Sequence, residues 1–289
     1  VALLSLGASV AQADAERLEA DLRAALEREG SLEIGEVSDE LLGSTTSAEN
    51  LTLTGDSGER LTIARYLVEG DYDAPEEVVL EDIELVDRGA SMLLERLVFE
   101  EPGQPVLDLR DLPWDEDNPL AGISLEGLVM DQRQGKVGAD LPWGDYPGRI
   151  EIQSLGASDV SADAIGSLTL TGMSGSSDNF EELGAGTFSL PSLSLTGLKG
   201  LASDAPTVDA LELEDLEIAT DRLVASLEHL VADGDMNDGE YSGRMDNLTV
   251  DLARMIELAP VDERTQLRLV SNVLTDGSGQ LTLDADMDG

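Results

Sequence analysis

Two short clusters of acidic residues have the spacing that calcium ligands need. In each cluster, side chains with oxygen ligands occupy alternate positions close to a glycine, as in the first half of an EF-hand loop. One cluster lies at 233–239 and the other at 284–289. Solvated turns of an acidic chain have the same composition, so Ca²⁺ sites and plain turns are both open interpretations. The candidate ligands are Asp233, Asp235, Asn237, Asp284, Asp286 and Asp288.

Other residue types that carry catalysis are scarce. The chain contains no cysteine and one histidine, His229. The lack of cysteine excludes thiol nucleophiles, disulfides and thiolate metal sites, and a single histidine argues against a zinc site. The sequence also lacks a G-x-S-x-G turn and the glycine-rich loops that hold nucleotides. We therefore expect a protein that is not an enzyme and that has no organic cofactor.

The dominant compositional feature is negative charge. The chain has 61 acidic and 17 basic residues, which gives a net charge of −44. Repulsion among these charges opposes a compact fold in dilute salt, whereas molar salt shortens the Debye length to about 3 Å and screens it. The composition thus favours adaptation to a saline medium. Nucleic acids and anionic lipid headgroups are poor partners, because both are bound by clusters of Lys and Arg.

Residues 1–13 resemble the tail of a secretory signal peptide. The run at 1–8 is apolar and uncharged, and Ala11-Gln12-Ala13 has the small-x-small pattern of a cleavage site. We expect the mature protein to begin near Asp14 and to be periplasmic or secreted. No later apolar run approaches the roughly 18 residues that a membrane-spanning helix needs, so we expect no such helix in the mature chain.

The segment 14–30 predicts an N-terminal helix. Leu18, Leu22 and Leu26 fall on one helical face. Asp14 is suited to cap its start and Gly30 to end it. A helix with one apolar stripe of this kind packs on a sheet, and its acidic polar face argues against membrane-surface binding.

The segment 31–220 changes to an alternating pattern. Apolar and polar residues alternate in several L-x-L-x-G or I-x-L-x-G units, which begin at positions 51, 123, 168 and 193. Strict alternation with one polar face is typical of half-buried antiparallel strands. The units are unevenly spaced, so we interpret the region as a long β-rich meander rather than a strict solenoid.

The segment 221–289 predicts a mixture of helix and strand, continuous with the sheet. Val224, Leu227 and Leu230 have helical spacing, so we expect a helix over 221–233 that Asp221 caps. His229 lies inside this helix, where we expect it at the surface or at the boundary of the core. Two further helices are expected over 248–258 and 262–274, and a strand over 279–285.

This combination resembles bacterial periplasmic envelope proteins of the AsmA-like and YdgA-like kind. The resemblance lies in the strand patterns at 61–66, 79–85, 245–252 and 275–283. It covers most of the chain after residue 45, as pattern rather than as diagnostic residues. It implies a curved sheet with an apolar inner face, a role in envelope lipid homeostasis, and no catalytic residues.

The predicted fold class is mainly β with flanking helices, an α+β arrangement of a long, twisted antiparallel sheet. The apolar face of such a sheet must be covered by helices, by a second sheet or by a ligand. We expect a groove for lipid acyl chains where the helices leave this face open, with a lipid or an envelope protein as partner. A dry structural or adaptor protein of the envelope and a Ca²⁺-dependent secreted module are the alternatives. The candidate groove residues are Leu53, Ile63, Leu125, Leu170 and Leu195.

Overall fold

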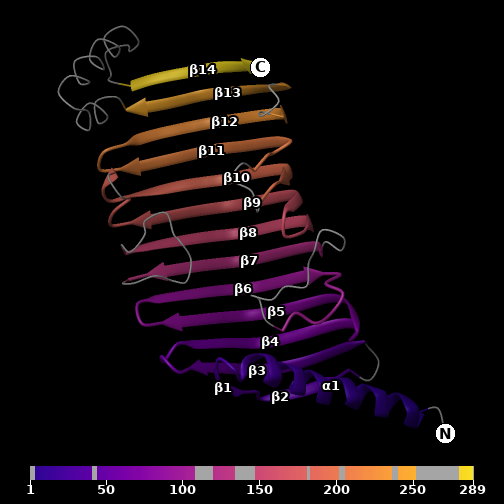
Figure 1. The fold of residues 1–289 in the computed structure, drawn as a ribbon. Helices are drawn as coiled ribbons and strands as arrows, with labels where there is room; N and C mark the ends of the chain where they lie inside the picture. The colour runs from indigo at the N-terminus through magenta and orange to yellow at the C-terminus, as the bar shows by residue number, and fades with distance from the viewer. Residues whose placement is uncertain are drawn as a thin grey trace. The chain divides into compact units, whose positions relative to one another are not determined.

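The computed structural model of the chain describes residues 4–40, 44–107, 120–133, 147–180, 183–201, 206–235, 240–251 and 280–288. Within these residues there is one helix, α1 (Leu4–Leu26), and fourteen strands (Figure 1). The strands are β1 (Gly30–Glu33), β2 (Glu36–Asp39), β3 (Thr45–Gly55), β4 (Arg60–Asp71), β5 (Ala74–Asp87), β6 (Ala90–Glu100), β7 (Leu120–Gln132), β8 (Gly148–Val160), β9 (Ala164–Ser177), β10 (Gly186–Lys199), β11 (Ala210–Thr220), β12 (Val224–Asp235), β13 (Glu240–Asp251) and β14 (Gln280–Asp288).

The strands form one large sheet, which confirms the mainly β class. From β3 to β14 the strand order follows the order of the chain, while β1 and β2 both pair with β3. The pairing is antiparallel in the ladders of β3–β6 and β10–β14. The chain divides into two compact units, Val1–Met130 with Ser154–Ile165 and Asp131–Gln153 with Gly166–Gly289.

In the first unit, α1 packs on the sheet next to β1, β2 and β3 (Figure 1). Leu18 and Leu22 of α1 are almost fully buried in a core that they share with apolar side chains of β3–β6. The buried core residues of these four strands are Ala48, Leu51, Ile63, Tyr66, Val68, Val78, Leu80, Ile83, Leu94, Leu97 and Phe99. This burial explains why the amphipathic pattern of α1 forms a stable helix here.

Polar contacts tie α1 to the connection between β4 and β5. The Arg17 guanidinium donates a hydrogen bond to Asp73 at 2.6 Å and lies over the Tyr72 ring, 4.6 Å from its centroid. The Tyr72 hydroxyl in turn donates to the carboxylate of Asp21 at 3.0 Å. The helix is thus held by an apolar face and by a polar clasp formed by Arg17, Asp21, Tyr72 and Asp73.

The predicted N-terminal helix is present, but its bounds differ from the prediction. It begins at Leu4, so Asp14 lies inside the helix and does not cap it. The alanines at 8–13 explain the extension, because alanine is the best helix former. The helix ends at Leu26, and Gly30 is the first residue of β1, where it pairs with Gly55.

Every second strand from β3 to β13 contains one residue in the left-handed region near its middle, with φ between +50° and +67°. We call this residue the kink residue of the strand. Glycine adopts this conformation without strain, and Asn and Asp tolerate it better than other side chains. The glycines of two predicted alternating units, at 127 and 172, are kink residues. The six are Asn50, Asp82, Gly127, Gly172, Asp215 and Asn247.

The kink changes which side chains share a face of the strand. In β11, Leu213 and Leu216 are both half-buried, while Glu214 and Asp215 between them are exposed. The pairing with β12 resumes after the kink and skips Asp215. A step of three residues therefore keeps apolar side chains on one side, where a regular strand would need a step of two. The strict alternation predicted for 31–220 is interrupted once in such a strand.

The predicted helix over 221–233 is wrong, because these residues include most of strand β12. β12 pairs with β11 on one side and with β13 on the other. Opposite the kink of β11, β12 also has apolar side chains three residues apart, at Leu227 and Leu230. Leu227 pairs with Leu216 of β11, and Leu230 pairs with Leu213. An i, i+3 pair of leucines is also what one helical face contains, so the two structures share this signal.

The second unit aligns apolar side chains in rows across its strands. Leu193, Leu213, Leu230 and Met245 form one such row over β10, β11, β12 and β13. All four side chains are half-buried rather than buried. The described part of this unit contains no helix that packs on them.

The remaining C-terminal predictions have mixed outcomes. The strand expected over 279–285 is confirmed as β14. The helix expected over 248–258 is wrong at 248–251, which belong to β13. Residues 252–258 and the helix expected over 262–274 lie outside the described residues. Among the residues that are described, no helix combines the length and the apolarity needed to cross a membrane.

Candidate functional site

An apolar cavity of about 290 Å³ lies inside the first unit, between α1 and the sheet. Small-molecule sites begin at about this size, roughly 300 Å³. Leu22 and Leu26 of α1 form one wall, and the segment after β6 contributes Val106 and Leu107. The sheet wall consists of Leu51, Leu53, Leu61, Ile63, Tyr66, Leu80, Ile83 and Leu85.

Tyr66 fastens the segment after β6 to the sheet wall. Its hydroxyl donates a hydrogen bond to the backbone carbonyl of Val106 at 3.0 Å, and the side chain is 2% exposed. Burial raises the pKa of Tyr66 well above its ordinary value, so the phenol stays neutral and keeps donating. This contact holds Val106 against the cavity without placing a charge inside it.

Two carboxylates give the cavity a polar edge. Among the lining residues, Glu29 and Glu59 are the ionisable side chains with carboxylates, and no lining residue is Arg or Lys. Glu29 follows α1 and Glu59 belongs to the turn between β3 and β4. The lining therefore offers no Arg or Lys as a counter-charge to an anionic group.

The structure places two of the five predicted groove residues in this cavity, Leu53 and Ile63. Leu125 packs against the core of the same unit but does not line the cavity. Leu170 is buried and Leu195 half-buried in the second unit, where Leu195 pairs with Leu211. The five residues therefore do not form one lining.

The sequence prediction missed the cavity walls contributed by α1 and by the segment after β6. Leu22 and Leu26 had a signal, the apolar stripe of the predicted helix, and only their partner on the sheet was unknown. Val106 and Leu107 fall in the region 31–220 for which the sequence predicts a strand meander, whereas 104–107 lies outside any strand. No local pattern indicates that this segment returns to Tyr66, 40 residues earlier in the chain.

The predicted calcium ligands that the structure describes lie in strands rather than in loops. Asp284, Asp286 and Asp288 lie within β14, with Asp286 and Asp288 paired to Arg244 and Ser242 of β13. A calcium loop curves around its ion, whereas a strand is extended. Of the other cluster, Asp233 and Asp235 lie in β12, and Asn237 is outside the described residues.

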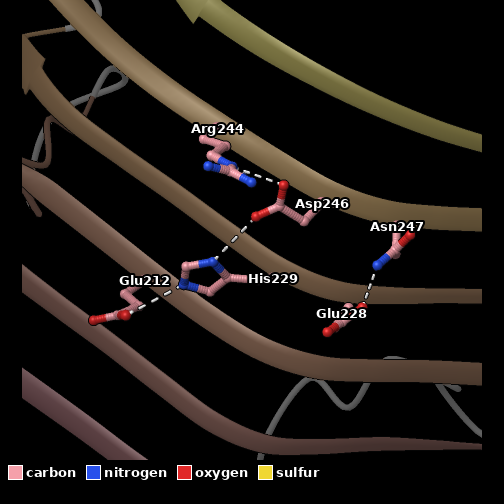
Figure 2. Close-up of polar contacts among 6 residues, drawn as sticks. All are labelled: Glu212, Glu228, His229, Arg244, Asp246 and Asn247. Atoms are coloured by element: carbon pink, nitrogen blue, oxygen red, sulfur yellow. Dashed lines mark hydrogen bonds and ion pairs between the residues drawn. The ribbon is translucent and has the colours of Figure 1, made fainter.

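A different group of side chains comes together around His229 on β12. Its Nε2 lies 3.3 Å from Oε1 of Glu212 on β11, and Glu214 stands directly opposite it in the ladder. Ligand atoms of Glu212, Glu214 and His229 all lie within 4.8 Å of one another. On the other side of the ring, Nδ1 lies 3.6 Å from Oδ2 of Asp246 on β13, as Figure 2 shows for Glu212 and Asp246.

The kinks help to assemble this group. β11 exposes the consecutive pair Glu214 and Asp215, and β13 has its kink at Asn247, next to Asp246. Asn247 donates a hydrogen bond to Glu228, the residue before His229 (Figure 2). Three neighbouring strands therefore present polar side chains around one imidazole.

Arg244 neutralises the carboxylate of Asp246. Its Nε donates to Oδ1 of Asp246 at 2.7 Å, and this contact is the main reason why the pKa of Asp246 is lowered. Glu212 and Glu214 have no Arg or Lys within ion-pair distance among the described residues. Within the described part of the chain, Glu212 thus pairs with His229 and with no Arg or Lys.

Comparisons with protein-family models, with curated proteins and with solved structures found no match for this chain.

Proposed function

We propose that this chain is a non-enzymatic, exported envelope protein that holds the acyl chain of a lipid in the cavity under α1. The observation that carries the proposal is the cavity itself, with leucine, isoleucine and valine on three walls. Burying an acyl chain there gains about 0.8 kcal/mol for each CH₂ group removed from water. The signal-like pattern of residues 1–13 and the resemblance to AsmA-like and YdgA-like proteins support the envelope location.

The charge of the residues that line the cavity indicates which lipid head groups fit there. Because Glu59 is a lining residue and no Arg or Lys lines the cavity, an acyl chain with a neutral or cationic head fits better than a free fatty acid. The net charge of −44 acts in the same direction over a longer range.

The test is binding of a fluorescent long-chain amine and of the matching fatty acid to the full chain in molar salt. Leu53→Trp fills the cavity from the sheet wall, so we expect it to weaken binding of the amine at least about tenfold. The matched control is Leu93→Trp on β6, where the side chain is 48% exposed and a larger ring meets solvent. Circular dichroism checks that both variants keep the strand content.

Equal affinity of Leu53→Trp and the unmodified chain for the probe would contradict the proposal. Lipid extraction followed by native mass spectrometry gives a second readout on the unmodified chain. A chain that carries no lipid and binds neither probe is the dry structural or adaptor protein that the sequence also allowed.

A further inference from the structure

We propose that Glu212, Glu214 and His229 bind a divalent transition-metal ion of the zinc type on the polar face of β11 and β12. The site uses residues of the second unit, so it is independent of the acyl-chain cavity. Either proposal can fail without the other.

The donor set selects the class of metal. One imidazole nitrogen and two carboxylate oxygens suit zinc and similar ions, which accept His and Glu ligands together. Ca²⁺ and Mg²⁺ prefer sets made of oxygen alone. The exposed glutamates leave further coordination positions to water.

The geometry needs little rearrangement. Ligand atoms around a four-coordinate zinc ion lie about 3.4 Å apart, since each is about 2.0–2.1 Å from the metal. Nε2 of His229 and Oε1 of Glu212 are already 3.3 Å apart. Glu214 is exposed and stands opposite His229 in the ladder, so rotation of its side chain closes the remaining distance.

Asp246 orients the imidazole as the outer carboxylate of a metal site does. It lies on the Nδ1 side of the ring, and Arg244 fixes it from behind (Figure 2). Without a metal, Nε2–H donates to the carboxylate of Glu212, which can only accept. When a metal takes the Nε2 lone pair, the ring hydrogen lies on Nδ1, where Asp246 accepts it and holds the ring in place. Asp246 is therefore a positioning residue and not a ligand.

The carboxylates of Glu212 and Glu214 also favour a bound cation on the Nε2 side of the His229 ring. Glu212 and Glu214 carry two negative charges that no Arg or Lys of the described residues pairs with. By contrast, the pairing of Asp246 with Arg244 removes the need for a metal on the Nδ1 side. A divalent ion between the two glutamates and Nε2 would neutralise the pair.

The first experiment is a calorimetric titration of the full chain with ZnCl₂ in molar NaCl and excess CaCl₂, which occupies non-specific carboxylates. We expect one zinc ion per chain and a loss of at least about tenfold in affinity for His229→Gln and for Glu214→Gln. The control is Glu217→Gln, an exposed glutamate of the same strand, which should bind zinc unchanged. Unchanged zinc affinity in His229→Gln would mean that only diffuse carboxylates hold the ion, and it would overturn the proposal.

The second experiment uses the fact that the chain has one histidine. Nuclear magnetic resonance of histidine-labelled protein gives one imidazole, whose Nε2 signal should shift on addition of zinc. Asp246→Ala should weaken zinc binding about 10–100-fold and change the tautomer ratio, and Asp246→Glu should restore both. An Nε2 signal that stays in place while zinc binds would also overturn the proposal.

Discussion

The two units use the same strand pattern, but they cover their apolar side chains to different extents. In the first unit, α1 and the segment after β6 lie over the sheet, and most of the buried core residues of the described chain belong to that unit. In the second, the row of Leu193, Leu213, Leu230 and Met245 is half-buried. The comparison shows that alternating strands with kink residues form the ladder. Segments outside the strands determine how far the apolar side chains of the ladder are shielded from water.

The largest expected effect separates the two units directly. Leu22→Ala removes a side chain that is 1% exposed, and it should lower the free energy of unfolding by about 2–5 kcal/mol. Leu213→Ala in the half-buried row should cost only about 1 kcal/mol, because less apolar area returns to water. Urea titrations followed by circular dichroism in molar salt measure both. Equal losses would show that the second unit is covered as tightly as the first.

Substitution of a kink glycine by alanine should lower the free energy of unfolding by a similar amount in both units. Gly127→Ala and Gly172→Ala place a Cβ on residues with φ of +67° and +64°, which costs about 1–2 kcal/mol each. The added Cβ would also press on Glu95 in the first case and on Gln153 in the second. Asp215→Gly is the control, since glycine fits its φ of +54° without strain. A loss confined to one unit would show that the kink is needed in that unit alone.

The smallest expected effect is a pH dependence confined to the clasp on α1. The Arg17 guanidinium lowers the pKa of Asp73 below its ordinary value of 3.8. The folded chain then binds fewer protons than the unfolded chain, so this contact stabilises it above pH 3.8 and is lost as the pH falls through the lowered pKa. Burial raises the pKa of Asp14 and acts in the opposite direction.

Asp73→Asn isolates this contribution from that of Asp14. The difference in thermal midpoint between the unmodified chain and the variant should shrink as the pH falls from about 5 to about 2. Hydrogen exchange of amides in α1 and in β11 locates the effect in the first unit. Melting curves that stay parallel over this range would contradict the role of the clasp.

The sequence predicted the strands well because one polar face imposes a visible pattern. It failed at 221–233 because the step of three residues from Leu227 to Leu230 is common to a kinked ladder and to a helix. A kink depends on the backbone angle φ of a single residue such as Asp215. An exposed Asp does not mark the position of a kink, because exposed Asp residues are common in so acidic a chain. Leu53 and Ile63 were predicted as cavity residues from their face of the sheet alone.

The cluster around His229 could not be predicted for a related reason. Its members lie on three strands, and Glu212 is 17 residues from His229, so their proximity depends on the register of β11, β12 and β13. Residues that are predicted to be helical have no strand register, so the helix predicted over 221–233 concealed the proximity of these side chains. Once β12 is a strand, Glu214, His229 and Asp246 follow as one line across the ladder.

The order of the strands has a consequence for how the chain folds. In the ladders of β3–β6 and of β10–β13, each strand pairs with the strands next to it in sequence. Such pairings need only short loops to close, so they form at a low entropic cost and without waiting for distant segments. Hairpins can therefore be added one after another along the chain, and α1 becomes stable once β3–β6 provide the apolar face on which it packs.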